Sequence, residues 1–349
     1  MNAFKVPRNP LKILVIAPSW VGDMVLAQSL FKILHLQYEN AQIDVLAPKW
    51  NCQLLEMMPE VSQSIEMPIG HGELRLKLRI KIANALKKAA YDWAIVLPNS
   101  LKSALIPWLA NIPKRSGWRG EFRYGLLNDL RKPDLDSYPI TVQRYASLAF
   151  PPLYKFIKTS EQFFLPEPQL HPSEETIQAS LRFFGLDSTK PILALCPGAE
   201  FGQAKKWPSE YFQQVARQHI NKGGQVWLFG SMADRISCED VAKPFDTPQM
   251  KNFAGKTSLD QAVALLSKAN QVVANDSGLM HVAAALGRPV VAIYGSTSED
   301  LTPPLSEKSI AVSVEIDCRP CQKKVCPYGH YRCLKELKPD SVIDALAQL

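Results

Sequence analysis

The feature that most limits the fold is a regular alternation of short apolar segments with helical patterns. Apolar segments typical of buried strands occur at 12–17, 43–47, 93–97, 192–196, 225–229, 271–274 and 290–294. Helical patterns lie between them at 24–36, 50–58, 74–90, 100–109, 209–221, 233–242, 259–267 and 278–286, and another closes the chain at 338–349. Strands that alternate with helices predict parallel βαβ units in doubly wound sheets. The predicted fold class is therefore α/β.

A chain of 349 residues is too long for one ordinary core and fits two domains. The linker between the domains is expected in a proline-rich segment that shows little hydrophobic periodicity. Its prolines are Pro151, Pro152, Pro166, Pro168 and Pro172. We therefore predict Rossmann-like domains at 1–165 and 166–335 and a closing helix at 336–349. The expected ligand position in such folds is a cleft at the carboxyl ends of the strands.

The composition points to a globular protein, with 46% hydrophobic and 21% charged residues. No apolar run approaches the roughly 18 residues of a membrane-spanning helix, and the polar start of the chain is unlike a signal sequence. The expected location is the cytoplasm.

The net charge of +7 is unevenly distributed. Residues 1–150 hold 19 Lys and Arg against 12 Asp and Glu, whereas residues 151–349 hold 21 of each class. An excess of positive charge favours an anionic partner such as nucleic acid, an acidic membrane surface or an acidic glycan. A plain solvated surface is the alternative.

Polar loops follow the predicted strands. The first, Pro18–Asp23, lacks the G-x-G-x-x-G pattern of dinucleotide sites. Asp23 either caps the next helix or acts as a general base. The second loop, 196–202, contains Glu200 and is followed by Lys205 and Lys206, which could reach a phosphate or simply be solvated.

Two further loops complete this set. Gly230–Asp234 places Asp234 either on a hydroxyl-rich ligand or at the start of the next helix. In the last loop, Asn275 and Asp276 end a short strand and an alanine-rich helix starts at once, with His281 about one turn inside it. Backbone N–H groups and the positive end of a helix dipole at such a junction favour an anion.

Together, several motifs resemble those of the ADP-heptose:lipopolysaccharide heptosyltransferases. They are Ser19–Asp23, the Pro-Gly-Ala-Glu loop at 197–200 with Lys-Lys-Trp-Pro at 205–208, and Asn-Asp-Ser-Gly-Leu-Met-His at 275–281. The runs at 97–104, 117–120 and 124–129 are most similar to the heptosyltransferase II branch of that family. The resemblance extends from Lys12 to about residue 305.

This resemblance implies the GT-B architecture, in which two Rossmann-like domains face each other across a cleft. It implies an N-terminal acceptor domain and a C-terminal ADP-heptose domain. It further implies an inverting transfer of heptose to the first heptose of the lipopolysaccharide inner core, with Asp23 as general base. A base at a helix N-terminus has a lowered pKa, so its effect would depend on positioning as well. Donor-binding residues carry over to Lys205, Asp276, Ser277, Gly278, His281, Glu200 and Asp234.

The partners implied are ADP-heptose and an anionic inner-core acceptor, with peripheral contact to the cytoplasmic face of the inner membrane and no nucleic acid. Candidates for the acceptor contact are the basic residues Lys102, Arg115, Arg119 and Arg123. We expect no cofactor for the chemistry, because Lys205 and helix amides could stabilise the departing ADP.

A dense group of thiols lies near the C-terminus, at Cys318, Cys321, Cys326 and Cys333, with His330 among them. Four thiolates suit a structural zinc ion, although the spacing matches no regular zinc ribbon. Reduced cysteines without a ligand are an equal alternative. Cys52, Cys196 and Cys238 are scattered and are expected to be small buried residues.

Three other functions fit parts of the pattern. A heptosyltransferase I, or a relative with a different core acceptor, would share most of these motifs. A Rossmann oxidoreductase would need the dinucleotide fingerprint that is missing here. A two-domain solute-binding protein would need an export signal.

Overall fold

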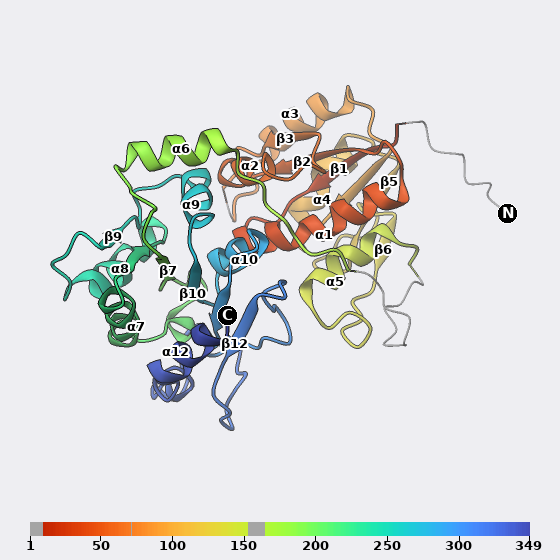
Figure 1. Cartoon of the computed structure of the whole chain (residues 1–349). Coiled ribbons are helices and arrows are strands. Elements are labelled where there is room, and N and C mark those ends of the chain that lie inside the picture. Colours follow the sequence, from red (N-terminus) through yellow and green to blue (C-terminus); the bar gives the residue numbers. More distant parts are fainter. Residues whose placement is uncertain (1–9, 71, 153–164) are drawn as a thin grey trace. The chain divides into compact units, whose positions relative to one another are not determined.

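The computed structural model describes residues 10–70, 72–152 and 165–349. Contacts within the chain divide it into two compact units, Met1–Pro166 and Glu167–Leu349. Figure 1 shows the first in red to yellow and the second in green to blue. Much of the predicted linker, at 153–164, lies outside the described residues.

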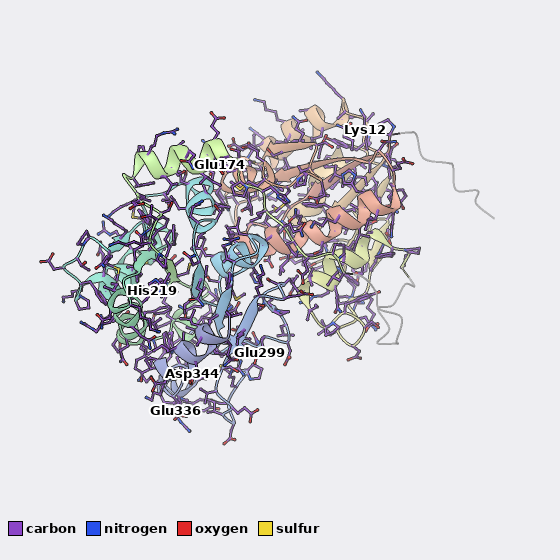
Figure 2. The ribbon with its side chains drawn as sticks, in the orientation of Figure 1. Lys12, Glu174, His219, Glu299, Glu336 and Asp344 are labelled. Carbon is purple, nitrogen blue, oxygen red and sulfur yellow. The ribbon has the colours of Figure 1, made fainter. Side chains whose placement is uncertain are left out.

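The first unit is built on a parallel sheet of six strands in the order β3-β2-β1-β4-β5-β6. The strands are β1 (Lys12–Ile16), β2 (Gln42–Ala47), β3 (Gln63–Glu66), β4 (Trp93–Val96), β5 (Lys114–Trp118) and β6 (Asp129–Arg131). The helices are α1 (Val21–Gln37), α2 (Lys49–Leu55), α3 (Leu76–Lys87), α4 (Leu101–Leu109) and α5 (Thr141–Ala146), and a 3₁₀ turn, η1, spans Ser147–Ala149. Figure 2 adds the side chains to this framework, with Lys12 labelled where β1 begins.

The chain order explains how the helices cover this sheet. The strand order reverses after β3, so right-handed crossovers put α1 on one face and α3 and α4 on the other. Leu14 and Ile16 of β1 share a buried cluster with Ala83 of α3 and Ala104 of α4. Helix α5 packs against α1.

The second unit repeats this design, with the order β12-β11-β10-β7-β8-β9. Its strands are β7 (Ile192–Cys196), β8 (Gln225–Leu228), β9 (Met250–Asn252), β10 (Gln271–Asn275), β11 (Val290–Ile293) and β12 (Ser309–Val312). Its helices are α6 (Glu174–Phe183), α7 (Ser209–Asn221), α8 (Arg235–Ala242), α9 (Leu259–Leu266), α10 (Gly278–Ala285), α11 (Arg332–Lys335) and α12 (Pro339–Gln348). Short 3₁₀ turns lie at η2 (Gln203–Lys205) and η3 (Met232–Asp234).

The core of the second unit shows why its central strands read as unbroken apolar runs. All five residues of β7 are buried, as expected for a parallel strand with helices on both faces. One buried cluster joins Leu195 and Val273 of the sheet to Phe212 of α7 and Val342 of α12. The described residues contain no helix that is both long and apolar enough to cross a membrane.

Candidate active site

The strand β10 lies in the middle of the second sheet, between β11 and β7. It ends at Asn275, and α10 begins three residues later at Gly278 with Ser277 as its N-cap residue. Within the described residues, the side chain of Ser277 makes no capping hydrogen bond to the helix. The first amide groups of α10 have no carbonyl partner inside the helix, so they are available to a ligand.

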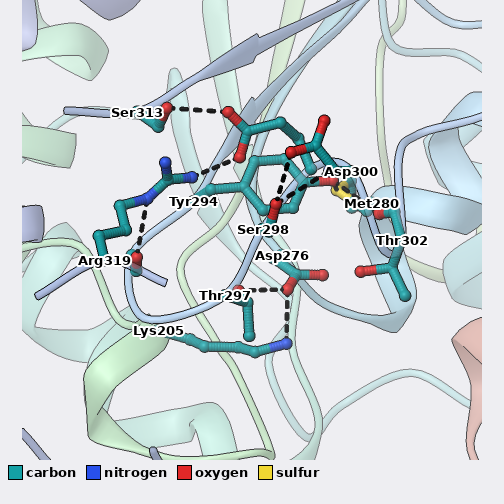
Figure 3. Close-up of polar contacts among 12 residues, drawn as sticks. Lys205, Asp276, Met280, Tyr294, Thr297, Ser298, Asp300, Thr302, Ser313 and Arg319 are labelled. Atoms are coloured by element: carbon teal, nitrogen blue, oxygen red, sulfur yellow. Dashed lines mark hydrogen bonds and ion pairs between the residues drawn. The ribbon is translucent and has the colours of Figure 1, made fainter. Parts of the chain in front are cut away.

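Asp276 joins three segments at this junction (Figure 3). Its Oδ2 accepts a hydrogen bond from Lys205 Nζ at 2.5 Å and another from Thr297 Oγ1 at 2.6 Å. Lys205 belongs to the loop after β7, and Thr297 to the loop after β11. Parallel neighbouring strands therefore deliver an ammonium, a carboxylate and a hydroxyl to one edge of the sheet. Asp276 and Thr297 are buried, and the Lys205 side chain is only 12% exposed.

His281 lies near Asp276 and Lys205, in the first turns of α10, and is 6% exposed. Its Nδ1 has no hydrogen-bond partner among the described residues. Burial lowers the pKa of His281 to about 4, with Lys205 acting in the same direction and Asp276 against it. The ring is therefore neutral near pH 7, and it has a buried polar atom for which a bound ligand could supply the partner.

Asn275 fixes the loop that carries Lys205. Its Nδ2 donates to Pro197 O at 2.7 Å, and its Oδ1 accepts from Trp207 N at 3.2 Å. The two bonds hold both ends of the 197–207 loop against the end of β10. A polar side chain with no exposed surface, as here, is expected to be fully hydrogen-bonded.

The other two proposed donor residues are placed differently. Asp234 Oδ2 accepts from the backbone and the hydroxyl of Ser231, in a capping box that starts η3. A Cβ at Gly198 would meet the Asp234 carboxylate at 2.2 Å, so glycine is required there. At α8 itself, where Asp234 is the N-cap residue, its side chain makes no capping hydrogen bond within the described part of the chain, and its role in donor binding stays a prediction. Glu200 is exposed in the same loop.

Asp23 lies in the first turn of α1, directly after the loop that follows β1. The hydroxyl of Tyr145, on α5, hydrogen-bonds to its carboxylate. Burial, and then the Asp23 charge, raises the pKa of Tyr145 well above its ordinary value, so this phenol stays protonated. Asn51 Nδ2 donates to Pro18 O and Ser19 O and so holds the loop before Asp23.

The carboxyl end of β4 lies beside that of β1, and the carboxyl end of β5 lies beside that of β4. Arg119 follows β5 and is exposed, and Lys102 lies in the first turn of α4 and is partly exposed. Both are therefore near the sheet edge at which Asp23 starts α1.

The other two arginines proposed for the acceptor, Arg123 and Arg115, both donate hydrogen bonds to backbone carbonyls. Arg123 is fully buried, and its guanidinium donates to Pro98 O at 2.6 Å and to Trp118 O. The prediction that Arg123 touches the acceptor is wrong, because a side chain with no exposed surface is not presented to a ligand. Arg115 is partly buried and donates to the carbonyls of Leu126 and Ile112.

The four clustered cysteines line one small cavity together with His330, and all carry free thiols. Across the described ranges, no three His, Cys, Asp or Glu side chains are already arranged to hold a metal ion. Of the scattered cysteines, Cys196 and Cys238 are buried as expected, and Cys52 is only partly buried.

Comparison with known proteins gives this arrangement its context. Residues 79–332 match the profile of glycosyltransferase family 9 (heptosyltransferase). The chain belongs to this glycosyltransferase family. Lipopolysaccharide heptosyltransferase 2 of Escherichia coli (strain K12) is 45% identical over 346 residues, which cover 97% of this chain and 98% of the relative. Lipooligosaccharide heptosyltransferase 2 of Haemophilus influenzae is 43% identical, over 97% and 99% of the two chains.

A solved structure supports the same family at the level of the fold. The E. coli ADP-heptose lps heptosyltransferase II has a TM-score of 0.86 and 44% identity, over 97% of this chain and 98% of that one. A family 9 glycosyltransferase from Veillonella parvula has a TM-score of 0.84 at 21% identity, which shows the fold alone. The family 9 resemblance and the GT-B fold class predicted from the sequence are both confirmed.

Two residues of this family 9 site were missed by sequence reasoning as site residues. The run 294–297 was expected beside the 275–281 loop from strand adjacency, but Thr297 itself was not taken as a donor-site residue. Tyr145 lies on a short helix that was not predicted and carries no motif. Nothing in the linear sequence signals its contact with Asp23.

Proposed function

We propose that this glycosyltransferase moves heptose from ADP-heptose to the first heptose of the lipopolysaccharide inner core, with inversion at the anomeric carbon. The observation that carries the proposal is the group formed by Lys205, Asp276 and Thr297 at the start of α10. Identity of 43–46% to heptosyltransferase 2 proteins of three genera, over nearly the whole chain, supports the type II assignment.

In this proposal the donor binds at the end of β10. The Lys205 ammonium has three N–H donors, and the bond to Asp276 uses one of them, so two can reach the diphosphate. The amides of Ser277 and Gly278 face the same anion, and His281 offers its ring to the donor. These groups stabilise the negative charge that develops on ADP as the bond to the anomeric carbon breaks.

Asp23 takes the proton from the acceptor hydroxyl. The oxygen then forms its bond to the anomeric carbon, and ADP leaves with the electron pair of the bond that breaks. Tyr145 holds the carboxylate in one orientation, which matters as much as basicity for a general base. Lys102 and Arg119 are the proposed contacts to the anionic acceptor.

The substrate assignment is tested by measuring transfer from ADP-heptose to purified core acceptors that carry no heptose or one heptose. We expect turnover only with the acceptor that has one heptose. Transfer to the acceptor without heptose would instead assign the chain to the heptosyltransferase I reaction.

The role of Asp23 is tested with Asp23→Ala. General bases contribute about 10²–10⁴-fold, so kcat should fall by that factor while the Kd for ADP stays unchanged. Asp134→Ala in the same unit is the control, because Asp134 accepts hydrogen bonds from Ser137 in a turn. Near-normal turnover of Asp23→Ala would exclude Asp23 as the general base and leave it only a role at the start of α1.

We propose that the chemistry needs no bound metal, and that the protein works on the cytoplasmic face of the inner membrane. The excess of seven positive charges within residues 1–150 supports a peripheral contact with anionic lipids. Sedimentation with vesicles tests this contact, and binding to phosphatidylglycerol vesicles should exceed binding to phosphatidylcholine vesicles at low salt. Equal binding to both kinds of vesicle would argue against this membrane contact.

Activity that survives removal of free divalent ions would support the metal-free chemistry.

A further inference from the structure

Four of the seven cysteines meet at one point of the second unit, three in the loop between β12 and α11 and the fourth, Cys333, in α11. Cys318, Cys321, Cys326 and Cys333 line a cavity of about 10 Å³, whose wall is completed by Ala204, Ser296 and neighbouring residues of the same loop. This volume is close to the minimum that holds one water molecule, so a single ion fits the space. The sequence places the thiols close together along the chain, but only the fold turns them toward one cavity.

His330 is a weaker candidate ligand than the four thiols. Its Nδ1 accepts a hydrogen bond from Arg332 N at 3.0 Å, and the same atom lies 3.9 Å from Cys326 Sγ. The ring is thus already used to shape the turn that follows Cys326. Four sulfur ligands remain, which is the set of a closed structural zinc site.

The loop that carries the cysteines also makes hydrogen bonds to the two segments that bring Lys205 and Thr297 to Asp276. Lys324 O accepts a hydrogen bond from Ala204 N at 3.0 Å, and Gln322 N donates to Ser296 O at 2.8 Å. Arg319 Nε donates to Gly295 O at 3.1 Å (Figure 3). Ala204 is next to Lys205 and Ser296 is next to Thr297, so the cysteine loop holds the backbone on either side of the donor group.

We propose that Cys318, Cys321, Cys326 and Cys333 bind one zinc ion in a tetrahedral site, and that this site fixes the loops that present Lys205 and Thr297. Since the described thiols do not yet stand at coordination positions, the ion draws them inward and completes the site. Its role is structural and lies outside the transfer chemistry. The part concerning Lys205 and Thr297 rests on the proposed donor site.

The zinc site is tested by elemental analysis of the full-length protein, purified without chelators. We expect about one zinc ion per chain in the wild type. Cys318→Ser and Cys321→Ser should each reduce zinc retention by about tenfold or more. The control is Cys52→Ser, because Cys52 lies in the first unit and its thiol faces the carbonyls of Ala47 and Pro48.

The outcomes against the zinc site are equally distinct. Wild-type protein without near-stoichiometric metal, or with iron in place of zinc, would overturn the zinc assignment. Zinc that is retained by both serine variants would show that it binds elsewhere. The metal content of the wild type decides the matter even if a serine variant fails to fold.

The supporting role is tested by titrating ADP into the wild type and into folded Cys321→Ser. Coupling between two sites is typically about 5- to 150-fold, so the Kd for ADP should rise by a factor in that range in the variant. An unchanged Kd would overturn the link between the cysteine loop and the donor loops. Failure of the wild type to bind ADP would count against the donor site and leave the zinc measurement untouched.

Discussion

The Tyr145 hydroxyl donates a hydrogen bond to the Asp23 carboxylate, which joins α5 to the first turn of α1. The two helices pack along their sides, so the contact is held by more than its own energy. A phenol that stays protonated is a fixed donor, and it restricts the carboxylate to one orientation. The proposed base is therefore positioned by a residue nearly a full domain away in the sequence.

Tyr145→Phe should weaken catalysis, because the Asp23 carboxylate loses the donor that holds its orientation. A hydrogen bond to a charged group contributes about 1.5–3 kcal/mol, so kcat should fall by about 10- to 100-fold. The Kd for ADP should stay unchanged, and transfer kinetics together with ADP titration measure both quantities.

The matched control for this change is Tyr91→Phe. Tyr91 is buried just before β4, and its hydroxyl donates to Asp44 Oδ2 at 2.6 Å. Loss of this hydroxyl costs stability but should leave kcat close to that of the wild type. A kcat of Tyr145→Phe equal to the wild-type value would show that Tyr145 does not position Asp23.

Lys205→Met tests the leaving-group side of the reaction. Loss of one fixed charge that stabilises a transition state costs about 10²–10³-fold, and kcat/KM should fall by that factor. The change also leaves Asp276 buried without its ion pair, which destabilises a protein by about 3–5 kcal/mol. The double variant Lys205→Met with Asp276→Asn should regain most of this stability but not the activity.

Lys206→Met is the neighbouring control, since Lys206 Nζ lies 3.9 Å from Asp234 Oδ1 and bonds weakly to Ser237. We expect its kcat/KM to stay much closer to that of the wild type. If Lys206→Met and Lys205→Met lost activity equally, Lys205 would have no special role in binding the diphosphate. Both are measured by transfer kinetics and by thermal unfolding.

The parts of the fold that could be predicted are the segments whose own sequence pattern specifies a strand or a helix. Central strands such as β7 and β10 are continuous apolar runs, because helices cover both of their faces. The four edge strands, β3, β6, β9 and β12, were missed, and so was β5. They are short, and each edge strand is defined by its pairing with a single neighbour, β2, β5, β8 or β11.

The same distinction applies to the candidate site. Lys205 and Asp276 stand at the ends of β7 and β10, and once these strands are taken as neighbours their meeting follows from the sheet. Arg123 was taken as surface charge because arginine is seldom fully buried. Its place is set by carbonyl groups of Pro98 and Trp118, which are brought together only by tertiary folding.

Arg119 and Arg123 are close in sequence and should respond in opposite ways to substitution. Arg123→Met removes a buried donor from at least two carbonyls, so we expect a loss of about 2–4 kcal/mol in the free energy of unfolding. Arg119→Ala removes an exposed side chain and should leave stability within about 0.5 kcal/mol while raising KM for the anionic acceptor. Denaturant unfolding and acceptor kinetics separate the two. An unchanged KM in Arg119→Ala would exclude this arginine from the acceptor site.

His281 should make the stability of the second unit depend on pH in the acidic range. Its pKa is about 4 in the folded protein and about 6.5 when unfolded. As the pH falls from about 6.5 to about 4, the unfolded chain takes up a proton that the folded protein does not. The free energy of unfolding should therefore fall across this window by about 3 kcal/mol in total, at about 1.4 kcal/mol per pH unit.

The measurement is denaturant unfolding at several pH values, followed by a signal from the second unit such as the fluorescence of the buried Trp227. His281→Gln should flatten the curve between these pH values, whereas His171→Gln, an exposed histidine of the same unit, should not. Bound ADP should extend the fall to pH values below about 4 if the neutral ring takes part in donor binding, because the folded state then resists protonation further. A wild-type curve as flat as that of His281→Gln would show that the ring is not held neutral by its burial.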